Sequence, residues 1–324
     1  MKSKSIIVIF CLVSLLLLTV TQTYAAADKG LGTKWDPIKI GTVIFYGFMP
    51  SYKVVDILSD KGIFAATYQF PNATERLEAV AGGYLNVSYA GLTASIMLAA
   101  AGKDIVVLCS TNEGGRGIVA RKEIKSLKDL IGKKVGTTFG SIEHMSLIGE
   151  LVHAGINPKD VGIVNIPASY DLPLAMASGG IVAYCGFEPW AQIGVTKYDG
   201  HILAYPYNSP MGKIDSGIET TREFIDKYPD LTYQIVKAHI EAVEFYRKNL
   251  DECVKEAVKR YKIPQEVAEA TTKNASFAYD INIENLKALA KFLKDFGYIK
   301  DYPDWNRFID DRFLKRAKKE LGIQ

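Results

Sequence analysis

The sequence predicts an α/β protein of two doubly wound units, and three observations lead to this. Short β-branched or apolar segments alternate with segments of helical periodicity between residues 38 and 187. The alternation restarts near Gly117, as expected for two successive units of about 80–100 residues each. The length of 324 residues exceeds what one core ordinarily organises, so we expect two domains.

The first unit contains four predicted strands and three predicted helices. Isoleucine, threonine and valine alternate with other residues in the first strand, and Gly62 and Gly82-Gly83 end two of the helices. The predicted strands are 38–44, 67–70, 86–90 and 104–110, and the helices are 52–61, 74–80 and 93–101. Continuous apolar strands between helices indicate a parallel sheet covered on both faces.

The second unit repeats this order. Ser126 and Asp129 have the spacing of a capping box, and Ser141 is expected to cap a long helix that ends near Gly155. The predicted strands are 117–120, 134–137, 163–166 and 181–187. Apolar residues then recur three or four positions apart from Leu231 to Phe245, so the last hundred residues are predicted to be helical.

The N-terminus is predicted to be a cleavable export signal over residues 1–25. Lys2 and Lys4 precede an apolar stretch, 6–18, that is too short to cross a bilayer of about 30 Å. Small residues at 25–27 offer cleavage sites, whereas an uncleaved anchor is the alternative. Cys11 lacks the Leu-x-x-Cys context of a lipid-anchored protein.

Charge and cysteine content exclude several classes. The net charge of +3 falls to +1 once the two lysines of the leader are removed, which is too weak for a general nucleic-acid binder. Cys109, Cys185 and Cys253 are widely spaced and form no Cys-x-x-Cys or Cys/His cluster, so we expect no metal and no cofactor. Whether two of them form a disulfide stays open.

Motifs of catalysis are missing from the sequence. It contains no Walker loop, G-x-S-x-G, H-E-x-x-H or G-x-G-x-x-G, and its four histidines form no pair at positions i and i+4. A binding function is therefore favoured over an enzymatic one.

Candidate binding residues lie where predicted strands end and helices begin, because ligands of doubly wound sheets bind there. Hydroxyl groups and free N–H groups at a helix start favour an anion, although plain helix capping is the alternative. The candidates are Phe48, Met49 and Ser51 after the first strand, Gly91, Leu92 and Thr93 after the third, Asn112, and Thr138, Phe139, Ser141 and His144 in the second unit.

Two acids and a tryptophan complete the candidate set. Glu188 and Trp190 end a strand, where the carboxylate could accept an ammonium group and the indole could stack on a ligand. Asp215 precedes the expected return to the first unit. The structural alternatives are that Glu188 is a surface acid, that Trp190 only covers the core and that Asp215 is an acid of a turn.

The order of segments resembles the periplasmic solute-binding proteins of ABC importers, in the nitrate, sulfonate and taurine group. The resemblance rests on IKIGTV, MPSYKVVD, RLEAVAGGYLNVSYAGLTASIMLAAAGKDIVVL, the stretch from IKSLKDLIGKKVG to GIVNI, LAMASGGIVAYCGFEPW, REFIDKYPDL and LAKFLKDFGYI. These stretches cover most of residues 38–300, and SLKDLIGKKVG is the most specific of them.

The resemblance implies the type II periplasmic binding-protein fold, in which two lobes are joined by two crossover strands. It implies one lobe from 38–115 plus 218–324 and another from 116–217. It also implies a periplasmic, monomeric protein that delivers a small molecule to an ABC permease and its ATPase.

Taurine-binding members are the most similar, and they imply an anion site at the helix start that holds Phe139, Ser141, His144 and Ser146, with Asp215 near the ligand ammonium. Two features depart from that pattern. The Gly91–Thr93 turn has one hydroxyl where two serines are expected, and Glu188 replaces a small neutral residue. Glu143, in the first turn of the same helix, further disfavours a purely anionic ligand such as nitrate.

The hypothesis is therefore an exported receptor for a zwitterion such as taurine. One alternative ligand is a nitrogen heterocycle, such as a thiamine-pyrimidine or flavin precursor, stacked on Trp190, Tyr46 and Phe48. Thiamine-pyrimidine synthases resemble this fold, but their cysteine-rich motif is missing here, and the leader also disfavours an enzyme. A sensory input domain would need a fused membrane or signalling segment.

Overall fold

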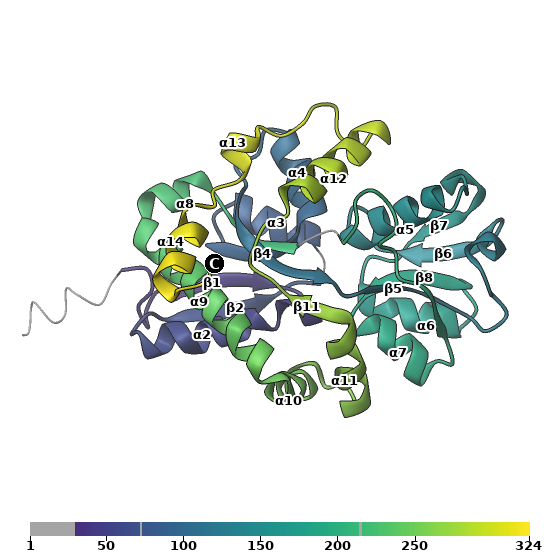
Figure 1. The fold of residues 1–324 in the computed structure, drawn as a ribbon, viewed down its shortest axis with the longest axis horizontal. Coiled ribbons are helices and arrows are strands. Elements are labelled where there is room, and N and C mark those ends of the chain that lie inside the picture. The colour runs from purple at the N-terminus through teal and green to yellow at the C-terminus, as the bar shows by residue number, and fades with distance from the viewer. Residues whose placement is uncertain (1–29, 72, 214–215) are drawn as a thin grey trace, which may run out of the picture.

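The structure is a computed structural model that describes residues 30–71, 73–213 and 216–324. Two α/β bodies lie side by side along the long axis of the molecule (Figure 1). The predicted α/β class with two sheets is confirmed. The expected leader over residues 1–25 and the candidate Asp215 lie outside the described residues.

Within the described residues, the larger sheet has six strands in the order β11-β4-β10-β3-β1-β2. β1 pairs in parallel with β2 and β3, and β10 lies antiparallel between β3 and β4. The sheet is mixed rather than wholly parallel, because a strand that returns from the second body runs against its neighbours. The strands are β1 (Ile38–Thr42), β2 (Ala65–Gln69), β3 (Val87–Gly91), β4 (Val106–Gly114), β10 (Ser216–Thr220) and β11 (Ala275–Phe277).

The smaller sheet has the order β7-β6-β8-β5-β9 in the described part of the chain. β6 pairs in parallel with β7 and β8, whereas β5 is antiparallel to both β8 and β9. All its strands come from one continuous stretch of sequence: β5 (Arg116–Ala120), β6 (Lys134–Thr137), β7 (Gly162–Asn165), β8 (Ala183–Phe187) and β9 (His201–Ala204).

Helices surround both sheets (Figure 1). The first body contains α2 (Pro50–Asp60), α3 (Ala73–Ala81), α4 (Leu92–Ala100), α8 (Arg222–Lys227), α9 (Pro229–Lys248), α10 (Leu250–Tyr261), α11 (Gln265–Asn274), α12 (Ile283–Asp295), α13 (Trp305–Phe308) and α14 (Arg312–Leu321). The second contains α5 (Ile142–His153), α6 (Leu172–Ala177) and α7 (Trp190–Lys197). Short 3-10 turns are η1 (Tyr46–Phe48), η2 (Leu127–Leu130), η3 (Pro158–Asp160) and η4 (Ser169–Asp171).

Two predicted caps are present. The Ser141 hydroxyl accepts the backbone N–H of His144 at 3.2 Å, which satisfies one free donor at the start of α5. Ser126 and Asp129 form the expected capping box before η2. Thr93 departs from expectation: α4 begins at Leu92 after Gly91, so Thr93 lies inside the helix rather than at its cap.

β4 runs four residues beyond its predicted end, directly to the junction between the bodies. Its final part carries Ser110, Thr111 and Asn112, all fully buried. The sequence places polar residues where a strand usually ends, but these side chains find buried partners: Ser110 donates to the Ser216 carbonyl at 3.1 Å, and the Asn112 amide donates to the Gly114 carbonyl at 3.3 Å.

The junction itself is short. Gly114 and Gly115 have φ values of +73° and +72°, and Arg116 then begins β5. A Cβ at Gly115 would lie 3.2 Å from the Ala275 Cβ, so glycine meets both the backbone and the packing requirement there. This connection and the return strand β10 lie near the two crossovers that the sequence led us to expect; the exact lobe boundaries stay a prediction.

Two apolar clusters join the two bodies. Ile193 of α7 belongs to the main core cluster of the first body. Leu92 and Ile96 of α4 pack with Ile142, Met145 and Ile148 of α5, so helices from the two bodies meet directly. In the described ranges no helix combines the length and the apolar character that crossing a bilayer requires.

Candidate functional site

A cavity opens between the two bodies, next to the α4–α5 contact. It holds about 600 Å³ of space, including open solvent at its mouth. Both bodies line it: Val43, Phe45, Phe48, Pro71, Ala73, Arg76, Gly91, Ala94 and Ser216 come from one, and Arg116, Thr138, Ser141, Ile142, Glu143, Pro167, Ser169 and Phe187 come from the other.

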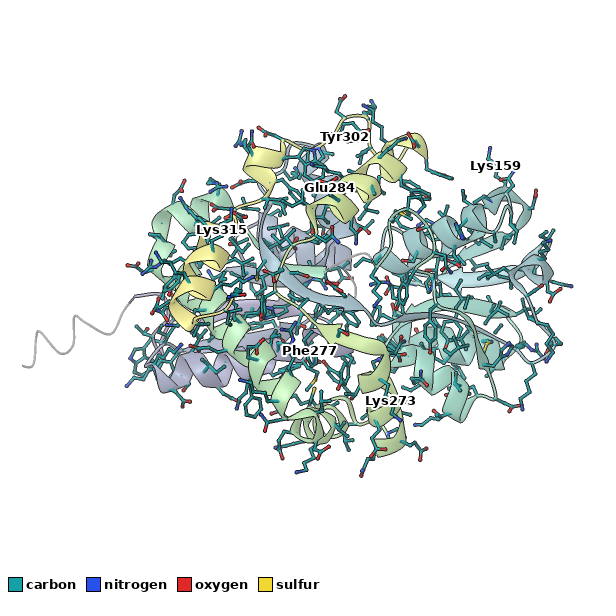
Figure 2. All side chains as sticks on the ribbon, in the orientation of Figure 1. Lys159, Lys273, Phe277, Glu284, Tyr302 and Lys315 are labelled. Carbon is teal, nitrogen blue, oxygen red and sulfur yellow. The ribbon has the colours of Figure 1, made fainter. Side chains whose placement is uncertain are left out.

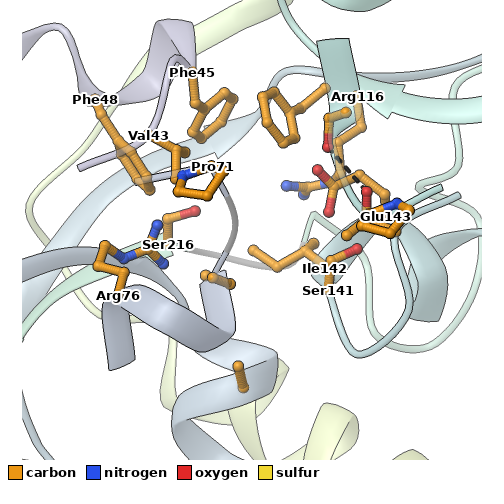
Figure 3. Close-up of a pocket in the computed structure, with 17 residues that line it drawn as sticks. Val43, Phe45, Phe48, Pro71, Arg76, Arg116, Ser141, Ile142, Glu143 and Ser216 are labelled. Carbon is orange, nitrogen blue, oxygen red and sulfur yellow. Dashed lines mark hydrogen bonds between the residues drawn. The ribbon is translucent and has the colours of Figure 1, made fainter. Parts of the chain in front are cut away.

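Two buried arginines reach this cavity from opposite sides (Figure 3). Arg76 lies in the first turn of α3 and Arg116 begins β5, and each is only 1% exposed. The Arg76 guanidinium carbon lies 5.9 Å from the centre of the Phe48 ring. Burial lowers the pKa of Arg76 to about 10, against the opposing charges of Glu219 and Glu143, so the group remains cationic at neutral pH. A buried guanidinium that lines a cavity attracts an anionic ligand.

Two buried carboxyl groups limit the positive charge. Glu143, in the first turn of α5, lines the cavity beside Arg116 (Figure 3). Burial raises its pKa, while the Ser141 hydroxyl and both arginines oppose the rise. Glu219 is fully buried in β10, and its Oε2 accepts the Ser95 hydroxyl at 2.5 Å. Its Oε1 has no hydrogen-bond partner among the described residues.

Helix starts add partial positive charge at the cavity wall. α4 follows Gly91 and α5 follows Ser141, and both residues line the cavity. The first N–H groups of a helix have no intrahelical partner, and the helix dipole favours an anion there. Gly91 also lies against the opposite body: a Cβ at Gly91 would meet the Ile142 Cδ1 and Cγ1 at 2.8 Å.

Four predicted site residues line the cavity: Phe48, Gly91, Thr138 and Ser141. The Thr138 hydroxyl donates to the Ile166 carbonyl at 2.9 Å and bonds the Ser169 hydroxyl at 3.0 Å. The hydroxyls of Thr138 and Ser141 thus also hold their own loops, as the capping alternative anticipates. Their contact with a ligand stays a prediction.

Nine of the described candidates lie away from the lining. Five of them are fully buried in the first body, and their contact with a ligand stays a prediction: Met49, Ser51, Leu92, Thr93 and Asn112. Phe139 is half exposed and its ring stacks on the His144 ring at 4.6 Å. Burial lowers the pKa of His144 to about 4, and its Nδ1 accepts the Gly140 N–H at 3.3 Å. His144 is therefore neutral at pH 7 and supports the α5 start.

Glu188 is fully buried beside the junction, outside the cavity lining. Its carboxylate accepts the Asn274 amide at 2.7 Å, the Gln192 N–H at 3.1 Å and the Thr271 hydroxyl at 3.3 Å. These hydrogen bonds join the second body to α11. From the sequence alone, Glu188 was expected to be a ligand-binding acid.

The aromatic candidates Trp190 and Tyr46 also lie outside the lining of the main cavity. Trp190 lines an adjoining recess rather than the main cavity. Tyr46, the third ring of the stacking alternative, is buried and its hydroxyl bonds the Thr272 hydroxyl at 2.5 Å. Phe45 and Phe187 line the cavity instead, and their ring centres are 4.9 Å apart.

Sequence reasoning missed both arginines, because it searched strand ends for hydroxyl groups. One local signal existed for Arg76: it precedes Val80 by four positions and follows Ala73 by three, so it shares a helix face with apolar residues. A charged residue on an apolar face is either paired or functional. Arg116 carried no such signal beyond the Gly-Gly before it.

The three described cysteines are free and buried. Among the described residues no cluster of histidine, cysteine, aspartate and glutamate could hold a metal ion. The polar chemistry of the cavity is thus that of arginine, carboxyl, hydroxyl and backbone N–H groups.

Comparisons with known proteins agree with this architecture. The chain is 27% identical to the taurine-binding periplasmic protein of Escherichia coli over 198 residues, which are 58% of this chain and 59% of that protein. The match therefore spans less than two thirds of that relative. A putative binding protein of Brucella abortus is 26% identical over 80% of both chains.

Solved structures show the fold. The nitrate-binding protein NrtA of Synechocystis superposes with a TM-score of 0.77 at 14% identity, over 88% of this chain and 89% of that one. The aliphatic sulphonate-binding protein SsuA of Escherichia coli superposes with a TM-score of 0.72 at 18% identity, over 85% and 92%. The fold is thus that of periplasmic binding proteins, as expected. The family model described as NMT1-like matches residues 32–261, and the chain therefore belongs to the NMT1-like family.

Proposed function

We propose that this protein is the exported, solute-binding component of an ABC importer. It captures a small organic anion or zwitterion between two lobes, 38–115 with 218–324 and 116–217, and delivers it to a membrane permease and its ATPase. The observation that carries the proposal is the convergence of Arg76 and Arg116, from opposite bodies, on one cavity. A ligand that bridges them favours the closed arrangement of the lobes.

A sulfonate that also carries an ammonium group, such as taurine, fits the charges. The sulfonate would lie between the arginines, near the starts of α4 and α5. Among the described residues Glu143 is the acidic residue of the cavity lining, so it takes the place of Glu188 as the proposed partner of the ammonium group. The call on Asp215 lies outside the described residues and stays a prediction. The E. coli relative binds taurine by name, which supports this class of ligand without fixing it.

A nitrogen heterocycle with an anionic group is the second candidate. Phe45, Phe48 and Phe187 in the lining favour it, since aromatic rings stack on planar ligands. In the part of the chain that the structure describes, no cysteine or histidine lines the cavity, and burial raises the pKa of Cys253 to about 12. These features favour binding over an enzymatic reaction at this site.

The test is titration calorimetry of the purified chain with taurine, ethanesulfonate, nitrate and a pyrimidine. Arg76→Gln and Arg116→Gln are each expected to weaken sulfonate binding at least about tenfold, since a charged hydrogen bond contributes about 1.5–3 kcal/mol. Arg121→Gln is the matched control, because Arg121 is exposed and pairs with Glu123 at 2.9 Å. Sulfonate binding that persists in both cavity variants would refute the arginine site.

A further inference from the structure

A second recess adjoins the main cavity and differs from it in chemistry. It holds about 340 Å³, including open solvent. Both recesses share four residues, so they are continuous: Val43, Pro71, Ser169 and Phe187. The remaining lining of the second recess is Ile44, Gln69, Phe70, Tyr170 and Trp190.

The second recess carries no charged residue in its described lining. One N–H of the Gln69 amide donates to the Tyr52 hydroxyl at 2.7 Å. Tyr170 and Trp190 meet edge to face, with ring centres 6.0 Å apart, and Tyr170 is 49% exposed. Tyr170 is exposed and Trp190 is partly buried, so the pair offers aromatic faces to a ligand next to the charged cavity.

The two bodies contribute to the recess as they do to the cavity. Ile44, Gln69 and Phe70 come from the first body, and Tyr170 and Trp190 come from the second. A group bound here would therefore contact both bodies and favour the same closed arrangement as the anion.

We propose that this recess is a second subsite for the same ligand, which binds an aromatic tail. The ligand class is an elongated anion: a sulfonate or carboxylate head between Arg76 and Arg116, joined by a short linker to an aryl group that packs on Phe187, Tyr170 and Trp190. This inference rests on the proposed function and narrows its substrate class from small sulfonates to aryl-bearing ones.

The charge distribution supports this orientation. Arg76, Arg116 and Glu143 all line the main cavity, whereas the recess offers aromatic faces and aliphatic carbons. Burying an aryl group there removes apolar area from water at no cost in unpaired charge. Taurine leaves the recess empty and gains nothing from it.

The experiment compares ethanesulfonate with 2-phenylethanesulfonate by titration calorimetry on the whole chain. The wild-type protein is expected to bind the aryl probe at least about tenfold more tightly. Tyr170→Ala and Trp190→Ala are expected to bring the ratio of the two dissociation constants toward one. Trp190 also packs on the core, so Tyr170→Ala, at a half-exposed position, keeps the test valid if Trp190→Ala does not fold.

Tyr302→Ala is the matched control. Tyr302 is 48% exposed at the surface of the first body and lines neither cavity, and its substitution should leave the ratio unchanged (Figure 2). Equal or tighter binding of ethanesulfonate overturns the aromatic subsite and leaves the proposed function in place. Failure of both sulfonates to bind the wild-type chain overturns the sulfonate site and, with it, the subsite.

Discussion

The Tyr207 hydroxyl holds both backbone polar groups of Arg116. It accepts the Arg116 N–H at 2.9 Å and donates to the Arg116 carbonyl at 3.0 Å. Tyr207 lies between β9 and β10, so the second connection between the bodies clamps the first. A Cβ at Gly114 would lie 3.2 Å from the same hydroxyl oxygen, which leaves no room for a larger residue without a shift.

Tyr207→Phe is expected to lower stability and weaken anion binding. The substitution leaves buried N–H and C=O groups of Arg116 without this partner, at a cost of about 1–3 kcal/mol. The free energy of unfolding in urea and the affinity for a sulfonate should both fall. Tyr205→Phe is the control, because Tyr205 stacks on Tyr207 but is 43% exposed. Equal behaviour of the two variants would contradict a clamp at Tyr207.

Glu188→Gln is expected to reduce stability while leaving affinity within about threefold. The new amide would present a donor toward the Asn274 amide, which now donates to Glu188 at 2.7 Å. Hydrogen bonds to a charged group contribute about 1.5–3 kcal/mol each, so the free energy of unfolding should fall by an amount in that range. Urea denaturation and ligand titration measure the two effects separately.

The control for this variant is Glu123→Gln, since Glu123 is exposed and its ion pair with Arg121 contributes little. An intact stability combined with a large loss of affinity would instead return Glu188 to the ligand-binding role that its position in the sequence indicates.

Local signals explain why the elements were predictable. β6 lies at its predicted residues, and Ser141 caps α5, because β-branched patterning and capping act within a few residues. The extension of β4 was not predictable, since residues 110–112 are polar and the strands that pair with them, β10 and β11, come from distant segments of the sequence.

The site was predictable only at its helix starts. Gly91 and Ser141 line the cavity because parallel strands end at one edge of each sheet. The fate of a polar side chain beyond that edge depends on tertiary partners. Glu188 accepts hydrogen bonds from Asn274 and Thr271 of α11. Arg76 lines the cavity, although no hydroxyl residue or glycine beside it in the sequence marks the position as a binding site.

Gly91→Ala is expected to weaken ligand binding by hindering the approach of the two bodies. The added methyl would lie 2.8 Å from the Ile142 Cδ1 and Cγ1, across the interface between α4 and α5. Overpacking of this kind costs about 1–3 kcal/mol, which corresponds to about 5- to 150-fold in affinity if it falls on the closed state alone. Titration calorimetry with a bound sulfonate measures it.

Ile142→Ala on the Gly91→Ala background provides the matched test. Removing both Cδ1 and Cγ1 relieves the two closest contacts, so the double variant should recover affinity relative to Gly91→Ala. A double-mutant cycle with no coupling between the two positions would show that the bodies do not approach through Gly91 and Ile142.

The charge of Glu219, which acts on the cavity residue Arg76, depends on pH. Burial raises its pKa to about 7, against the opposing effects of the Ser95 hydroxyl and the Arg76 charge. At pH 6 the group is mostly neutral and Arg76 is uncompensated from this side. At pH 8 the carboxylate forms and competes with an anionic ligand for the field of Arg76. Anion affinity should therefore fall as pH rises through about 7.

Glu219→Gln is expected to remove both pH effects. The carboxyl of the unfolded chain titrates near 4.5, so the folded state holds the Glu219 proton more tightly than the unfolded state does. The contribution of Glu219 to the free energy of unfolding is therefore complete below pH 4.5 and is lost as the pH rises to about 7. Glutamine cannot titrate, so the stability of the variant relative to wild type should rise across this window, measured in urea at pH 5, 6, 7 and 8. Its sulfonate affinity should stay level from pH 6 to 8. Glu223→Gln, at an exposed position on α8, should follow the wild type. A constant difference between Glu219→Gln and wild type would mean that Glu219 keeps one protonation state throughout.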